Sequence, residues 1–181
     1  MNAMGRTIDG IQYQKAPNKF KVQIKMGGQV FQEQIFNGEA GVTKQMGQSQ
    51  PMDEAMANVI KEQSIIFPEL EYRSDAYKME LKGIETVAGS DAYHILITAS
   101  SGGKTSVYYD IKKGLKVKII TTIKGPQGES AEISEIQEYT EVNGIKFPKK
   151  ATQTMMGQNI SVEFTEMKVN GGIDDAEFKI E

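Results

Sequence analysis

The sequence predicts a mainly β fold of the α+β class, in which a curved antiparallel sheet carries a helix on its concave face. Residues 81–170 read as short strand-like runs that are separated by glycine-rich turns, with no helical run between them. Residues 20–26 alternate apolar and polar side chains with a period of two. A single segment, residues 51–63, has the apolar spacing of an amphipathic helix. Many strands joined by short turns favour a sandwich, a barrel or a strongly curved open sheet, and the concave side of a curved sheet is the economical place for the helix.

The first forty residues predict three strands. Residues 7–15 form a short mixed run that ends at the turn signal Pro17-Asn18. In the next strand, residues 20–26, apolar side chains share one face: Phe20, Val22, Ile24 and Met26. A Gly27-Gly28 turn should lead into a strand over residues 29–37.

The predicted helix begins near Pro51, since proline suits the first helical position. Asp53 and Glu54 would lie in the first turn, where acidic side chains favour the positive end of the helix dipole. The apolar stripe comprises Met52, Ala55, Met56, Val59 and Ile60. An apolar run follows the helix and is stopped by Pro68: Ile65, Ile66 and Phe67.

The second half predicts a meander in which each strand pairs with the next. The expected strands cover residues 78–86, 92–98, 105–110, 115–123, 131–139, 145–155 and 160–169. The expected turns include residues 125–128 and Asn143-Gly144, and the latter is a strong hairpin signal. Pro148 indicates a sheet edge or a bulge, because proline cannot donate to the ladder. We expect the tail, residues 173–180, to dock through Phe178.

Composition narrows the class of protein. We expect the 181 residues to form a single domain over residues 1–181, which could be a fragment of a longer precursor or fusion. The charge is nearly balanced, with 21 Lys and Arg against 24 Asp and Glu, and the lysines are scattered, so no nucleic-acid partner is expected. There is no cysteine, and no apolar run approaches the roughly 18 residues of a membrane span. The N-terminus shows no signal-like segment, which indicates either a cytoplasmic protein or a targeting segment that was removed.

The search for chemistry predicts no catalytic residues, no metal and no cofactor. A zinc hydrolase of the HExxH type needs two histidines, and the chain has only His94. A Ser-His-Asp arrangement would have to use His94, but alternation places it opposite Ile95 and Ile97, as a structural or surface residue. Residues 101–105 (SGGKT) resemble part of a phosphate loop, but Thr98 stands where the first glycine is needed, so we expect a hairpin turn.

Methionine is frequent, with ten residues in the chain. Methionine fills irregular apolar space and also suits adaptable binding surfaces. Ordinary core packing and a cavity for an apolar ligand therefore both remain open.

Several motifs resemble, in order and spacing, those of the outer-membrane lipoprotein-sorting proteins, the periplasmic lipoprotein carriers and their relatives. They are residues 81–85 (LKGIE), 89–93 (GSDAY), 108–110 (YYD) with 114–115 (GL), and 139–148 (YTEVNGIKFP). Residues 15–20 (KAPNKF) and 36–38 (FNG) also fit. The resemblance implies a curved half-barrel whose helices cover a concave face, and a space that holds acyl chains or other lipophilic groups. It also extends to domains of bacterial envelope proteins that carry a zinc-protease label.

The first functional hypothesis is a non-enzymatic, periplasmic or otherwise extracytoplasmic domain with a cavity for a lipophilic ligand, such as a lipoprotein acyl chain. The expected cavity wall comprises Phe20, Val22, Ile24, Met52, Met56, Val59, Ile60, Ile65, Ile66 and Phe67. The second hypothesis is an accessory protein-interaction domain of an envelope protein or peptidase, without catalysis of its own. A third is an enzyme of unrecognised type, which would show a polar pocket with perturbed carboxylates.

Overall fold

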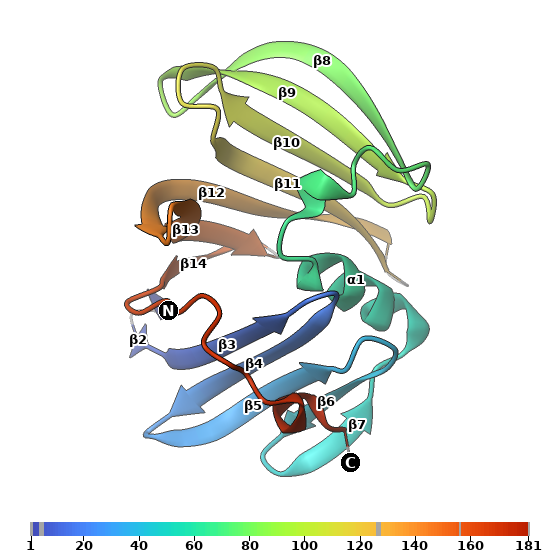
Figure 1. Cartoon of the computed structure of the whole chain (residues 1–181), viewed down its shortest axis with the longest axis vertical. Coiled ribbons are helices and arrows are strands. Elements are labelled where there is room, and N and C mark those ends of the chain that lie inside the picture. The colour runs from blue at the N-terminus through green and yellow to red at the C-terminus, as the bar shows by residue number, and fades with distance from the viewer. Residues whose placement is uncertain (1, 4–5, 126–127, 156, 181) are drawn as a thin grey trace. The chain divides into compact units, whose positions relative to one another are not determined.

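A computed structural model describes residues 2–3, 6–125, 128–155 and 157–180. The chain forms two compact units. The first unit contains residues 6–68 and the tail from residue 170, and the second contains residues 69–169 together with the first strand (Figure 1). Both units are built from antiparallel strands, and neither sheet closes into a barrel, which confirms the predicted fold class. The interpretation of residues 1–181 as one domain stays a prediction.

The first unit contains a five-stranded sheet whose strands pair in chain order. They are β3 (Asp9–Lys15), β4 (Lys19–Met26), β5 (Gln29–Phe36), β6 (Gly41–Gln45) and β7 (Gln48–Pro51). The first three were expected from the sequence, whereas the hairpin of β6 and β7 was missed. Its strands are short and rich in polar residues, so they lack the alternation that marks a strand. The turn between them, Met46-Gly47, has positive φ angles of 50° and 83°.

The predicted helix is present as α1 (Glu54–Ser64), but its expected start was wrong. Pro51 is the last residue of β7 and lies opposite Val42. The helix begins after Asp53, whose carboxylate accepts the backbone N–H of Met56 at 2.8 Å. An N-cap side chain therefore decides the boundary, three residues beyond the position that proline suggested.

Each face of this sheet carries an apolar cluster. On the face of α1, the cluster contains Phe20, Phe36 and Ile60, with Val22, Met52 and Ala57 packed against them. The other cluster contains Ile35, Val42 and Phe178, with Tyr13, Ile173 and Ile180 beside them. Phe36 and its neighbour Ile35 belong to different clusters because successive side chains of a strand point to opposite faces.

The C-terminal tail docks through Phe178, as the sequence predicted, and it covers the face opposite α1. Phe178, at the end of the 3₁₀ turn η2 (Asp175–Phe178), is 1% exposed. Asp175 accepts Lys19 Nζ at 2.8 Å and lies 3.0 Å from Lys15 Nζ. The tail is thus held by one buried aromatic ring and by charge pairs at its edge.

Lys21 is buried under the same tail. Its Nζ lies 2.8 Å from Glu177 Oε2 and 3.6 Å from Glu33 Oε2. Two carboxylates therefore compensate the buried ammonium group, which would otherwise be costly to remove from water.

The second unit contains a long, curved sheet (Figure 1). Its strands run in the order β1-β14-β13-β12-β11-β10-β9-β8. Their bounds are β1 (Asn2–Ala3), β8 (Tyr77–Val87), β9 (Ser90–Ala99), β10 (Lys104–Asp110), β11 (Lys116–Gly125), β12 (Gly128–Val142), β13 (Ile145–Met155) and β14 (Gln158–Glu163). A further two-residue strand, β2 (Arg6–Thr7), lies near the start of the chain.

The predicted meander is confirmed, with differences at its ends. The last strand stops at Glu163, and residues 164–169 form no strand. Residues 126 and 127 of the expected turn lie outside the described residues. Pro148 lies opposite Tyr139, immediately after the register shift at Glu138, so it occupies an irregular part of the β12–β13 pairing, as proline in a strand requires.

We predict that Phe178→Ala destabilises the first unit by about 3 kcal/mol, because it removes a fully buried ring and leaves a cavity between Ile35 and Val42. Urea unfolding and amide hydrogen exchange in β5 and β6 would measure the change. The exposed neighbour provides a control: Lys179→Ala should change the free energy of unfolding by less than about 0.5 kcal/mol. Equal stability of the Phe178 variant and the native chain would contradict this account of the tail.

Candidate functional site

The structure divides the expected cavity residues between a filled core and a more accessible surface. Phe20 and Ile60 are buried, and Val22 and Met52 pack against them in the cluster under α1. The remaining residues of the set are half-buried or exposed: Ile24, Met56, Val59, Ile65, Ile66 and Phe67. Met56, at 40% exposure, is accessible on the helix. The role of these residues in ligand binding stays a prediction.

The second unit presents an apolar face, none of whose residues belongs to the cavity wall expected from the sequence. The strand register places Leu81 opposite Ile95, Ile95 opposite Val107, and Val107 opposite Ile119. Cross-strand partners share a face of the sheet, so these four residues form one continuous apolar row across β8, β9, β10 and β11. In the neighbouring row Met79 lies opposite Ile97.

A third row on this face leads from apolar to polar residues. Ile84 lies opposite Tyr93, Tyr93 opposite Tyr109, and Tyr109 opposite Lys116. Ile84 shares the face of Leu81 although three positions separate them, because a bulge between Leu81 and Gly83 inserts an extra residue. Gly83 has a φ of +136°, a conformation that L side chains rarely adopt.

Exposure changes along these rows. Val107 is 2% exposed, whereas Leu81 is 63% exposed and Ile84 is 60% exposed. The face is therefore buried near its middle and open towards the edge strand β8. Large apolar side chains that stay in water on one face of a sheet typically mark a contact surface for a ligand or a partner.

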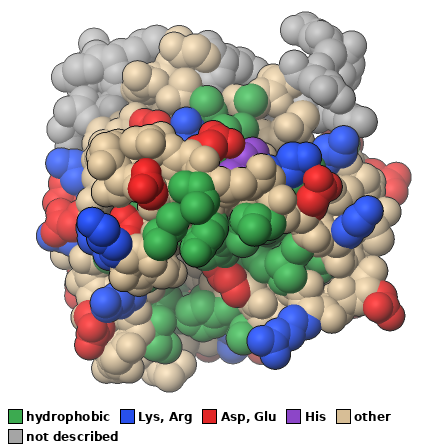
Figure 2. Space-filling view, turned by 90° about the horizontal axis from the view of Figure 1, so that it is seen from above, with side chains coloured by type: hydrophobic (Ala, Val, Ile, Leu, Met, Phe, Trp, Pro, Cys, Tyr) green, Lys and Arg blue, Asp and Glu red, His purple; other side chains and the backbone are tan. Residues whose placement is uncertain are grey.

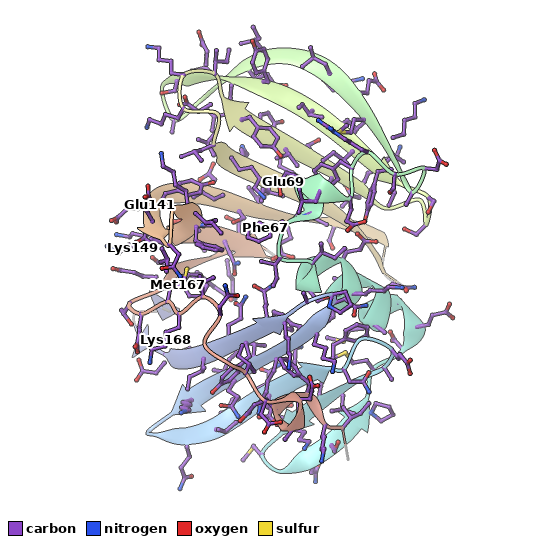
Figure 3. All side chains as sticks on the ribbon, viewed as in Figure 1. Phe67, Glu69, Glu141, Lys149, Met167 and Lys168 are labelled. Carbon is purple, nitrogen blue, oxygen red and sulfur yellow. The ribbon has the colours of Figure 1, made fainter. Side chains whose placement is uncertain are left out.

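A polar cluster lies at the inner end of the third row. Glu69, in the short 3₁₀ turn η1 (Pro68–Leu70), reaches the sheet beside β10 and β11 (Figure 3). Lys116 Nζ lies 2.7 Å from Glu69 Oε1, and the Tyr109 hydroxyl donates to the same oxygen at 3.3 Å. The Tyr139 hydroxyl donates to the backbone oxygen of Lys116 at 2.7 Å. We call these four residues the Glu69 cluster.

The electrostatics of the Glu69 cluster favour a charged carboxylate beside protonated hydroxyls. Burial acts to raise the pKa of Glu69, but the hydrogen bond and charge of Lys116, with help from Tyr109, outweigh it and hold that pKa below its ordinary value. Burial, followed by the charge of Glu69, raises the pKa of Tyr109. The same two causes raise the pKa of Tyr139 to about 12. Both hydroxyls therefore remain hydrogen-bond donors at neutral pH.

His94 lies on the opposite face of the same sheet, as alternation predicted. Its Nδ1 is 2.7 Å from Glu85 Oε1, and its Nε2 is 2.9 Å from Ser106 Oγ. The imidazole stacks on the ring of Tyr108 at 4.5 Å between centroids, and Figure 2 shows the single histidine at the border of a group of hydrophobic side chains.

The order Ser106, His94, Glu85 has the contacts of a catalytic triad but not its surroundings. Ser106 lies inside β10, where Leu96 and Ile120 flank it on the neighbouring strands. The backbone groups of a central strand are used by the ladder, so they cannot stabilise an oxyanion. The arrangement therefore fits a structural network that ties β8, β9 and β10 together.

Three further observations concern metal ligands, membrane-spanning helices and a surface depression. Within the described ranges, no group of three or more His, Cys, Asp or Glu side chains is placed to hold a metal ion. Among these residues, no helix is both long enough and apolar enough to cross a membrane. A shallow depression of about 620 Å³ lies beside the C-terminal tail, and its lining mixes charged, polar and apolar residues: Lys19, Asn37, Glu39, Asp175, Phe178, Lys179 and Ile180.

We predict that Glu69→Gln lowers the free energy of unfolding by about 1 kcal/mol at neutral pH, since the ion pair is partly exposed. The folded-state pKa of Glu69 is lowered, so its stabilisation is present above the ordinary value and is lost as the pH falls through the lowered pKa. The difference between variant and native chain should therefore shrink as the pH falls below the ordinary range of a glutamate.

Urea unfolding at several pH values measures this difference. Glu71→Gln is a matched control, because Glu71 is exposed in the same segment. A Glu69 variant that behaves like the Glu71 control at every pH would show that the Lys116 contact does not stabilise the fold.

Comparison with known proteins finds no matching family model and no matching curated relative. Three solved structures match along nearly the whole chain. A DUF1329 family protein from Desulfovibrio piger is 12% identical, with a TM-score of 0.66 over 98% of this chain and 85% of that chain. A LolA superfamily protein from Nitrosomonas europaea is 14% identical, with the same TM-score and the same coverage.

The third match is an outer membrane lipoprotein-sorting protein domain from Vibrio parahaemolyticus. It is 10% identical, with a TM-score of 0.62 over 94% of this chain and 80% of that chain. At such low identity the likeness concerns the fold alone. The chain therefore has the fold of the LolA-like lipoprotein-sorting proteins, in agreement with the resemblance seen in its motifs.

Proposed function

We propose that this chain is a non-enzymatic, extracytoplasmic binding domain that holds an acyl chain or a similar lipophilic group. The observation that carries the proposal is the apolar face of the second sheet, which leads from the buried Val107 to the exposed Leu81 and Ile84 at β8. Covering these exposed side chains with a hydrocarbon chain removes apolar surface from water on both sides, at about 25 cal/mol per Å².

The likeness to lipoprotein-sorting proteins supports this function and an extracytoplasmic location. The proteins whose fold this chain shares include a domain named for outer membrane lipoprotein sorting. The apolar face adds an argument from this chain's own residues, because its exposed part is too large to be an incidental single side chain. Four large apolar side chains of β8 and β9 are exposed on it: Met79, Leu81, Ile84 and Tyr93.

The surface around α1 is the second place where we propose ligand contact. Met56 and Phe67 are exposed, and Val59, Ile65 and Ile66 are half-buried. Phe20, Val22, Met52 and Ile60 would support this surface from beneath, because they already fill the core of the first unit. Ile24 is half-buried and shares the strand face of Val22.

A second candidate function is an accessory protein-interaction domain of an envelope protein. The observation that favours it is the position of β8 at the end of its sheet, with Met79 and Leu81 exposed. An edge strand offers unpaired backbone groups to a partner strand. Lys78 and Lys82 on the same strand weaken this alternative, since edge lysines typically discourage strand pairing.

We predict that Leu81→Glu lowers the affinity for a fluorescent fatty acid at least tenfold and leaves the fold intact, because the side chain is exposed but lies in the apolar row. Displacement of the fluorescent probe by an unlabelled fatty acid would give the affinity, and circular dichroism would check the fold. Met46→Glu is the control, since Met46 is exposed in the β6–β7 turn of the first unit.

Met56→Glu, tested in parallel, shows whether the helix surface also contacts the ligand. Loss of affinity in the Met56 variant alone would place the acyl chain at α1 and refute the sheet face as its site. Unchanged affinity in both variants would refute both surfaces.

A further inference from the structure

We infer that Lys116 and Tyr109 form a carboxylate-binding end of the proposed acyl site, where the carboxylate of a free fatty acid takes the place of the Glu69 side chain. The inference rests on the proposed function, and it adds the chemical class of the ligand's head group. The carboxylate of Glu69 stands in for that head group in the described conformation.

The donor geometry supports the inference. Lys116 Nζ and the Tyr109 hydroxyl both approach Glu69 Oε1, at 2.7 Å and 3.3 Å. One cationic donor and one neutral donor therefore converge on a single carboxylate oxygen. A carboxylate from any source would find the same two donors, and charge-assisted hydrogen bonds of this kind are among the stronger ones.

The two donors are held in place by the sheet. Tyr109 lies opposite Lys116 in the β10–β11 pairing, beside a register shift that follows Tyr108. Tyr139 fixes the start of β11 from a third strand, by its bond to the backbone oxygen of Lys116. The Lys116 side chain is only 21% exposed. An anionic partner therefore stabilises this half-buried ammonium group.

The position of the donors suits an acyl chain. They stand at the inner end of the row that continues through Tyr93 to Ile84. Three strand spacings separate β11 from β8, or about 14 Å, which a fatty acid of ordinary length can cross. A carboxylate at Lys116 would therefore leave the hydrocarbon tail on the face that carries the exposed side chains of Tyr93, Ile84 and Leu81.

Glu69 is placed to be displaced. It belongs to a turn of only three residues, and the next residue, Leu70, is 77% exposed. Glu69 itself is partly exposed. Because the turn contributes few buried contacts, the exchange of one carboxylate for another costs little beyond moving this segment. Glu69 would then act as a built-in competitor that weakens the binding of fatty acids and eases their release.

The test compares hexadecanoic acid with its methyl ester, binding to the native chain and to Glu69→Gln by isothermal titration calorimetry. Removing the competing carboxylate should tighten the binding of the acid about tenfold, which corresponds to about 1.4 kcal/mol. The ester has the same tail but no charge, so its affinity should change less than twofold. Lys116→Gln, added to Glu69→Gln, should abolish the gain, and Tyr109→Phe should reduce it.

The outcomes distinguish failure of the carboxylate-binding end from failure of the acyl site. An acid and an ester that gain equally from Glu69→Gln would overturn the carboxylate end and leave the acyl site standing. The carboxylate end would also be overturned if Lys116→Gln, added to Glu69→Gln, kept the full gain in affinity for the acid while circular dichroism showed an intact fold. A failure of both ligands to bind any form of the chain would refute the acyl site and the carboxylate end together.

Discussion

The alternation of side chains along a β-strand is the constraint on which the rest of this structure depends. Every sheet has two faces, and each apolar face must be covered or remain in contact with water. In the first unit both faces are covered within the unit, one by α1 over Phe20 and Phe36, the other by the tail through Phe178. In the second unit the apolar row ends in exposed side chains at β8. The functional proposal follows from this contrast.

The same constraint explains why the charged groups lie where they do. Lys21 and Lys116 both point to a covered face of a sheet, and each has a carboxylate within 2.8 Å. For Lys21 the carboxylate belongs to the tail that completes the first unit, and a second carboxylate, Glu33, lies nearby. The carboxylate that pairs with Lys116 belongs to the short turn η1, which has no fully buried residue. Pairing a cation on a covered face thus underlies both the Lys21 ion pair and the Lys116 ion pair that we propose to be exchangeable.

Much of the fold could be predicted from the sequence, because its signals are local. Alternation over residues 20–26 and the Asn143-Gly144 turn each specify their own structure. The helix is present, but its expected apolar stripe was only partly right, because Ala55 and Met56 are exposed whereas Ala57 and Ile60 pack on the sheet. The β6–β7 hairpin was missed because its strands are polar. The start of α1 was misplaced because Pro51 suits a helix N-terminus as well as a strand end, and only the contact from Asp53 to Met56 decides between them.

The candidate site was harder to predict, because it depends on register. Leu81, Ile95, Val107 and Ile119 lie far apart in the sequence, and only strand pairing brings them into one row. The bulge at Gly83 changes which residues of β8 lie on the apolar face, and no local sequence pattern predicted this bulge. Glu69 gave no signal either, since a lone carboxylate after Pro68 is typical of any loop. The alternation that sets Ile95 and Ile97 opposite His94 was a sequence signal that indicated this face.

The central claim is that the second sheet holds an acyl chain on its apolar face. Cross-linking with a fatty acid that carries a diazirine in its tail, followed by peptide mass spectrometry, tests this claim most directly. We expect the label on peptides from β8, β9 and β10, and a competing unlabelled fatty acid should remove it. Labelling that is confined to other peptides, or that an excess of fatty acid does not reduce, would contradict the account.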